Sequence, residues 1–369
     1  MRVANPGQAL AIVSDYTLTT DVGLDESEPE HAPHVLDMWR YGRHVLARAW
    51  PLVSRVALWR PTDTPTTREA AQRREEFVAW LVKSGVRKLF VLPTPDASLG
   101  GPAMPLRGTQ AWIALGPPDT IDAMRGTRWL REGVEVTVGY PLAKRSKELH
   151  RWCNARWLRA LGGDTLRPET DNVAHMPSEH MLDLMAAMAG RPLAVDLEFH
   201  PGEDIVTAVG LSDGVHAVSL PMDSYYPRNN PDRELGLSEY ELGRPLLEAM
   251  RTLLAAPTAK VAHNFVADIP RLERRNLNVG GPLHDTFAAH AIAFPELRHG
   301  LQHAAASMLP CPPWKSLYKP SRLARGITRD DVEYWTARGD ELRRYNYLDA
   351  FYTLNLARSV LPHVGVSLG

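Results

Sequence analysis

The chain has 369 residues, of which 44% are hydrophobic and 23% are charged, and its formal net charge is −1. This length suits two domains, and the composition is that of a soluble globular protein without the ~20-residue apolar run of a membrane helix, which excludes a membrane protein. The balanced charge gives no argument for nucleic-acid binding from overall basicity, and two cysteines are too few for a disulfide framework or a zinc cluster.

The N-terminal half contains short apolar runs separated by helical patterns. The runs lie at residues 9–13, 55–58, 88–92, 111–115 and 134–138, and one helical pattern covers residues 67–83. Strands that alternate with helices predict a parallel-sheet α/β domain, which we place at residues 1–165. The first eight residues show no export signal, and this, together with the few cysteines, predicts a cytoplasmic protein.

A basic segment lies between residues 125 and 167, where ten arginines and lysines outnumber the acids. Three tryptophans interleave these charges: Trp129, Trp152 and Trp157. Aromatic and basic side chains together suit a phosphate-binding face, but a solvated helix surface explains the charges equally well, so both interpretations stay open.

The C-terminal half begins after a polar linker at residues 162–173. A helix is expected at residues 177–188, followed by strands at 193–199, 205–211 and 215–220, with an Asp213-Gly214 turn between the last two. A further strand is expected at residues 260–263, and helices at 271–277, 286–293, 301–309 and 340–361. Three strands in a meander, followed by alternating helices and strands, predict a second α/β domain with a mixed sheet at residues 174–369.

Two acids share one face of an expected buried strand. Asp196 and Glu198 stand at i and i+2 between Val195, Leu197 and Phe199, so strand alternation places both carboxylates on the same side. Two like charges at ~4 Å repel by about 4 kcal/mol at an effective dielectric of 20, and a divalent cation would offset that cost. Oxygen ligands favour magnesium or manganese. An exposed strand with a chance Asp-x-Glu is the alternative.

Two later segments carry further acids. Asp268 follows Asn264 by four residues and precedes Pro270, which fits only a first helical turn, so Asp268 also suits a helix N-cap. Tyr345 and Asp349 stand at i and i+4 of the long C-terminal helix and share one face. An exposed helix position is the alternative for Asp349.

In order and spacing, Asp196-x-Glu198, Asn264-x-x-x-Asp268 and Tyr345-x-x-x-Asp349 resemble the three motifs of the DEDDy 3′→5′ exonucleases, which are RNase H-like. The likeness is closest to the proofreading domain of phage and bacterial family A DNA polymerases. Segments at 206–221, 245–247, 284–286 and 313–315, together with residue 301, resemble the same family. The match covers residues 175–365 and implies that residues 174–369 form an RNase H-like exonuclease domain.

The resemblance implies a set of residues with defined roles. Two divalent ions, Mg²⁺ or Mn²⁺, are implied on four carboxylates: Asp196, Glu198, Asp268 and Asp349. Tyr345 would orient the attacking water, while Asn264 and His263 would contact the terminal nucleotide. The implied substrate is single-stranded DNA or a frayed primer 3′ end, which is degraded to nucleoside 5′-monophosphates. Because the sequence ends shortly after the Asp349 helix, we expect the DNA polymerase to be a separate subunit.

Two other functions remain open. RNase D-type enzymes share the same acids, so the chain could be a 3′→5′ exoribonuclease. A non-catalytic nucleic-acid-binding scaffold is the alternative outside the enzymes, although a scaffold has no need for four costly acids and a tyrosine.

The N-terminal half resembles the framework of uracil-DNA glycosylases at residues 11–13, 112–116 and 136–141. It departs from that family at two positions, where Ser14-Asp15-Tyr16 replaces the catalytic loop and Gly139-Tyr140-Pro141 replaces a His-Pro pair. We therefore expect a degenerate fold that binds DNA or protein and does not excise uracil.

Overall fold

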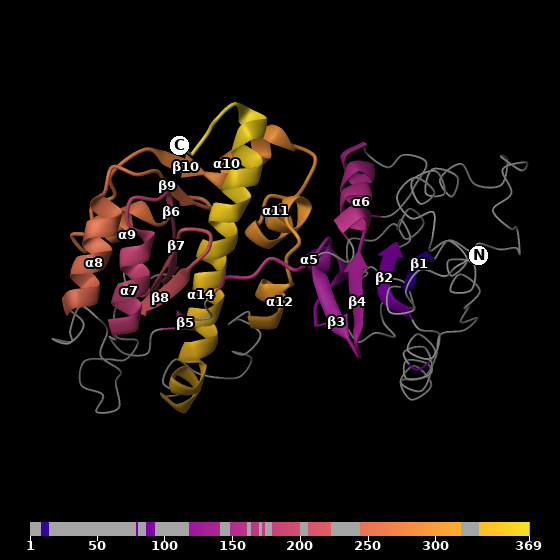
Figure 1. The fold of residues 1–369 in the computed structure, drawn as a ribbon, viewed down its shortest axis with the longest axis horizontal. Helices are drawn as coiled ribbons and strands as arrows, with labels where there is room; N and C mark the ends of the chain where they lie inside the picture. The colour runs from indigo at the N-terminus through magenta and orange to yellow at the C-terminus, as the bar shows by residue number, and fades with distance from the viewer. Residues whose placement is uncertain are drawn as a thin grey trace, which may run out of the picture. The chain divides into compact units, whose positions relative to one another are not determined.

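The fold is described from a computed structural model of the chain (Figure 1). The structure describes residues 9–14, 79, 86–92, 118–140, 148–160, 164–169, 172–173, 179–199, 206–222, 244–318 and 332–368. The chain divides into two compact units. The first comprises Met1–Thr165 and Pro310–Pro313, and the second comprises Leu166–Leu309 and Trp314–Gly369. No helix in the described ranges is long and apolar enough to cross a membrane.

The first unit contains a four-stranded sheet in the order β1-β2-β4-β3. Strands β1 (Ala9–Ser14), β2 (Val86–Leu92) and β4 (Val134–Val138) are parallel, as predicted. The expectation of a wholly parallel sheet is wrong, because β3 (Arg128–Arg131) runs antiparallel to β4. The turn between them uses Glu132 and Gly133 with φ of 48° and 77°, the left-handed backbone that two-residue hairpin loops require.

The described residues of this unit include the helices α5 (Ile121–Met124) and α6 (Glu148–Ala160). Parts of the basic segment serve the interior: the Arg125 guanidinium pairs with Asp122 and donates to the Gly139 carbonyl at 2.8 Å. Trp157 is buried. These side chains are structural rather than open to phosphate. The runs expected at 55–58 and 111–115 lie outside the described residues, as does the helix at 67–83 apart from residue 79.

The second unit contains a six-stranded sheet in the order β10-β9-β6-β7-β8-β5 (Figure 1). Strands β6 (Leu193–Phe199), β7 (Val206–Ser212) and β8 (Ala217–Pro221) form the predicted antiparallel meander. Strands β9 (Lys260–Ala262) and β10 (Leu283–Asp285) extend the sheet in parallel beyond β6, and β5 (Asn172–Val173) pairs in parallel with β8. The predicted α/β class with a mixed sheet is confirmed.

Helices cover both faces of this sheet. In the part of the chain that the structure describes, they are α7 (Glu179–Met188), α8 (Arg244–Ala255), α9 (Ile269–Glu273), α10 (Thr286–Ala293), α11 (Leu301–Met308), α12 (Trp314–Tyr318) and α14 (Val332–Val360), followed by the 3₁₀ helix η4 (Leu361–Val364). Apolar residues of α7, α8 and α9 form one core with Val195 and Leu197 of β6. The long helix α14 packs along β6, β7 and β8 (Figure 1). Strand alternation therefore turns Asp196 and Glu198 toward α14.

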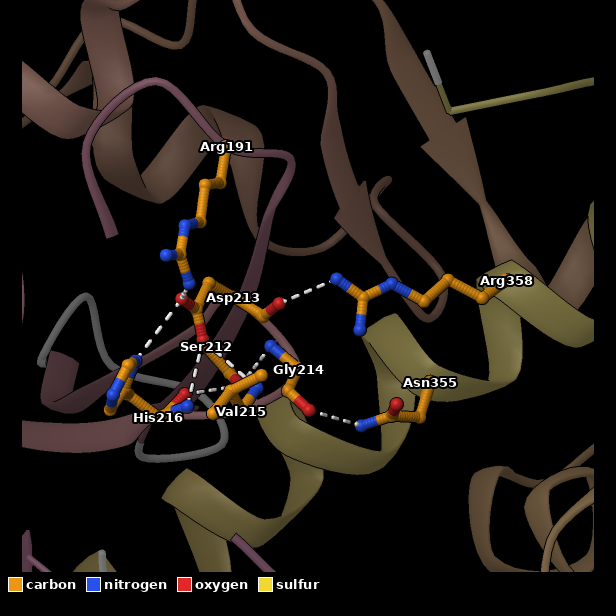
Figure 2. Close-up of polar contacts among 8 residues, drawn as sticks. All are labelled: Arg191, Ser212, Asp213, Gly214, Val215, His216, Asn355 and Arg358. Atoms are coloured by element: carbon orange, nitrogen blue, oxygen red, sulfur yellow. Dashed lines mark hydrogen bonds and ion pairs between the residues drawn. The ribbon is translucent and has the colours of Figure 1, made fainter. Parts of the chain in front are cut away.

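The turn between β7 and β8 fastens this hairpin to α14 (Figure 2). The buried Asp213 carboxylate accepts hydrogen bonds from the backbone amides of Val215 and His216, the His216 ring and Arg191. Arg358 of α14 donates to the Asp213 carbonyl and Asn355 of α14 donates to the Gly214 carbonyl. Burial disfavours the charged form of Asp213, but the hydrogen bonds that its carboxylate accepts from Val215, His216 and Arg191 outweigh burial and lower its pKa. The register of the hairpin against the helix is thereby fixed.

Candidate active site

Three carboxylates from two elements converge in the second unit. Asp196 and Glu198 come from β6 and Asp349 comes from α14, and one ligand oxygen of each lies within 4.8 Å of the others. Asp349 is 2% exposed. The i, i+2 spacing on the strand places the first pair together, and the passage of α14 across the same face adds the third. The exposed-strand and exposed-helix alternatives for these acids are wrong.

Asn346 joins α14 to the strand that carries the acids. Its side-chain amide donates to the Asp196 carbonyl at 3.0 Å and to Asp196 Oδ2 at 2.8 Å, and its oxygen accepts from Ser219 Oγ at 2.6 Å. The helix approaches closely because β7 has Gly210 at the crossing, where a Cβ atom would lie 2.7 Å from the Asn346 carbonyl oxygen. The buried amide thus orients the Asp196 carboxylate.

Helix α12 brings two hydrogen-bond donors to Asp349. Trp314 Nε1 donates to Asp349 Oδ1, and Lys315 Nζ donates to Asp349 Oδ2. The same ammonium donates to the Tyr345 hydroxyl at 2.8 Å and lies 4.6 Å from the centroid of its ring. Tyr345 therefore lies beside Asp349, as their i, i+4 spacing predicts.

The carboxylates resist ionisation in this setting. Burial, followed by the charges of Asp349 and Glu198, raises the pKa of Asp196 well above its ordinary value. Burial and Asp349 also raise the pKa of Glu198, to about 8. Lys315 opposes both shifts, but a single ammonium does not offset the burial and mutual repulsion of the three acids. The site is thus short of positive charge.

Asp268 lies beside this group without joining it. It occupies the N-cap position of α9, as the alternative interpretation predicts, but its side chain makes no capping hydrogen bond within the described residues. Burial raises its pKa to about 7, and its charge raises the pKa of Asp196 and Glu198. It is absent from the cluster formed by the other three acids. The Asp268 carboxylate therefore adds a fourth acid beside the cluster of Asp196, Glu198 and Asp349.

His263 and Asn264 follow β9 at the same end of the sheet. Thr286 Oγ1 donates to the Ala262 carbonyl, so it accepts from His263 Nδ1 at 2.9 Å, which fixes a neutral tautomer with the proton on Nδ1. Burial and then Lys315 lower the pKa of His263 to about 4. Asn264 is exposed with a φ of 74°, and its backbone amide donates to Asp285 at 3.0 Å.

Sequence reasoning singled out neither Lys315 nor Asn346 as a site residue. Lys315 is 34 residues from Asp349, and no local periodicity connects the two positions. Asn346 stands beside Tyr345 in the third motif, and a polar side chain on the apolar face of a helix was the available signal. Asp285 was also missed, although an Asp-Thr pair at the end of a strand is a usual N-cap pattern, and here it caps α10.

The donor set fits divalent cations. It consists of carboxylate oxygens alone, which Mg²⁺ and Mn²⁺ prefer, and the single Lys315 ammonium would not balance the charge of the three acids when all are ionised. A bound cation would lower the free energy of the ionised acids that burial otherwise disfavours.

Comparisons of the sequence with known proteins found no match. No family model matches the chain, and no curated protein matches it. Among solved structures, the chain is similar to the crystal structure of the Aedes aegypti Nibbler EXO domain, with 14% sequence identity and a TM-score of 0.36. That match covers 55% of this chain and 93% of the other.

Proposed function

We propose that the chain is a metal-dependent 3′→5′ exonuclease that removes nucleoside 5′-monophosphates from DNA ends. The observation that carries this proposal is the convergence of Asp196, Glu198 and Asp349 within 4.8 Å, with Tyr345 beside Asp349. Asp268 stands near enough for its charge to act on the first two acids. The polarity of the reaction rests on the resemblance of the three motifs to the DEDDy exonucleases.

The residues divide the chemistry between them. Asp196, Glu198, Asp268 and Asp349 would hold two Mg²⁺ or Mn²⁺ ions, which supply activation of water and stabilisation of the leaving 3′ oxygen. Asn346 holds the Asp196 carboxylate in one orientation. The Tyr345 hydroxyl accepts from Lys315 and also hydrogen-bonds to Asp349, a position at the acidic cluster from which it would orient the attacking water. His263 and Asn264 would contact the terminal nucleotide.

The proposed substrate is single-stranded DNA or a frayed primer 3′ end, and the proposed partner is a separate DNA polymerase subunit. Both parts rest on the likeness to proofreading domains. RNA in place of DNA would mark an RNase D-like enzyme, and failure to cut either would mark a scaffold.

One assay separates these outcomes. DNA and RNA of one sequence, labelled at the 5′ end, are incubated with the full chain in Mg²⁺, Mn²⁺ or EDTA. We expect a ladder that shortens from the 3′ end of DNA and disappears in EDTA. Asp349→Asn should abolish the ladder, whereas Asp183→Asn, which removes an exposed carboxylate of α7, should leave it intact. Cleavage by Asp349→Asn at a rate within tenfold of the parent would contradict the proposed site.

We also propose that the first unit does not excise uracil. The Tyr140 ring is buried and stacked on His150 at 3.9 Å, and its backbone exchanges hydrogen bonds with the side chain of Asn154. These contacts make Tyr140 part of the interior. Alkali-labile sites in uracil-containing DNA, produced by the Asp349→Asn protein, would contradict this proposal.

A further inference from the structure

Lys315 is a half-buried cation for which the three-motif resemblance supplies no role. Helix α12 places its ammonium against both side chains of the third motif: it pairs with Asp349 Oδ2 and donates to the Tyr345 hydroxyl at 2.8 Å. Asp349 Oδ1 is engaged by Trp314 Nε1. Both oxygens of this proposed metal ligand therefore already have donors from α12.

We propose that Lys315 is a positioning residue that competes with a divalent cation for Asp349 and holds the Tyr345 hydroxyl in place. The proposal rests on the proposed function, because it takes Asp349 as a metal ligand. It goes further by giving the site an internal counter-ion that a metal must displace from one carboxylate oxygen.

Charge is the first argument for competition. A divalent ion bound by Asp349 would lie within a few ångströms of the ammonium, and like charges at that separation repel strongly where water is excluded. The ammonium also occupies Asp349 Oδ2, one of the positions that such an ion would use. Metal binding to the parent protein therefore includes the cost of moving Lys315 away from Asp349.

The second argument is the geometry of Tyr345. An ammonium has three donors and no acceptor, so the Tyr345 oxygen accepts from Lys315, and the Tyr345 hydroxyl hydrogen-bonds in turn to Asp349. The lysine stem is flexible, so the ammonium can leave Asp349 and keep its bond to the hydroxyl. Lys315 would then direct the Tyr345 proton in the metal-bound site as well.

The test is a Mn²⁺ titration of EDTA-stripped full-length protein, with free Mn²⁺ followed by electron paramagnetic resonance. We expect Lys315→Met and Lys315→Gln to bind Mn²⁺ about tenfold more tightly than the parent, because the competing charge is gone. Lys315→Arg, which retains the charge, should bind like the parent. Arg251→Met removes a cation from α8, away from the site, and is the matched control; its affinity should not change.

A second readout addresses Tyr345. At saturating Mn²⁺ and with single-stranded DNA, Lys315→Met should lower kcat about tenfold and leave KM within a factor of two, as expected for a residue that positions a catalytic group. Should Lys315→Met fail to fold, Lys315→Gln supplies both measurements, since it removes the charge and keeps a polar donor.

The outcomes separate this proposal from the proposed function. Unchanged or weaker Mn²⁺ binding by Lys315→Met and Lys315→Gln overturns the competition, even when the parent degrades DNA. Tighter Mn²⁺ binding in a protein that cuts neither DNA nor RNA supports the competition and overturns the exonuclease. A parent that binds no Mn²⁺ overturns both.

Discussion

Replacing Glu198 with glutamine should stabilise the metal-free protein at alkaline pH. Glu198 lies beside Asp196 and Asp349 at the face covered by α14, and its pKa rises from 4.5 to about 8. Burial is the main cause and Asp349 the second. The variant Glu198→Gln keeps the size of the side chain and removes the charge that this environment disfavours.

The sign of the effect follows from proton binding. A carboxyl group with a raised pKa binds more protons in the folded than in the unfolded state between about pH 4.5 and 8. The free energy of unfolding of the parent therefore falls as pH rises through this window. At ~1.4 kcal/mol per pKa unit the shift sets an upper bound of about 5 kcal/mol, and partial solvent access and coupling to the other acids reduce it to about 2 kcal/mol.

The measurement is urea unfolding at pH 5 and pH 8 in EDTA, followed by circular dichroism. We expect Glu198→Gln to match the parent at pH 5 and to exceed it by about 2 kcal/mol at pH 8. Excess Mg²⁺ should raise the stability of the parent at pH 8 more than that of the variant. Glu296→Gln, at an exposed position, is the control. If Glu198→Gln and the parent have equal free energies of unfolding at both pH values, the negative charge of Glu198 does not oppose folding and the reasoning is refuted.

Three other substitutions test separate parts of the second unit. Tyr345→Phe should lower the rate of cleavage about tenfold to a hundredfold and leave the melting temperature unchanged, which single-turnover kinetics and calorimetry can check. Asp213→Asn should cost about 2 kcal/mol of unfolding free energy at pH 7; because the pKa of Asp213 is lowered in the folded state, this loss should shrink as pH falls below 4 in urea titrations. Gly210→Ala should lower both the melting temperature and the cleavage rate, since its Cβ would press on Asn346, and a fully active variant would contradict this.

Local periodicity was sufficient to predict much of the site. Alternation along β6 put Asp196 and Glu198 on one face, and helical spacing put Tyr345 and Asp349 together on another element. The Asp213-Gly214 turn predicted the β7–β8 hairpin, whose register decides which residues of β7 meet α14. These features depend only on the spacing of a few neighbouring residues, and the geometry of a strand, helix or turn fixes how such residues are oriented.

Features that depend on distant contacts could not be predicted in this way. Strand β3 was missed because its arginines suggested a charged surface, whereas its pairing with β4 and the burial of Arg128 give it a structural role. Asp268 lies at the predicted helix N-terminus, yet its side chain does not make the capping hydrogen bond that the alternative interpretation implied. Whether such a side chain is exposed, structural or part of a site depends on burial by the rest of the domain, which the local sequence does not show.

Lys315 illustrates why a sequence motif does not specify the whole of the candidate site. The motif specifies which acids come together, and their convergence alone would concentrate several negative charges in a buried region. The fold partly offsets that cost with an ammonium from α12 and an amide from Asn346, neither of which is a residue that the motif specifies. Because Lys315 pairs with the carboxylate that the proposed metal would use, the residue that stabilises the metal-free cluster would also weaken metal binding. Stability of the metal-free protein and affinity for the metal should therefore change in opposite directions when Lys315 is replaced.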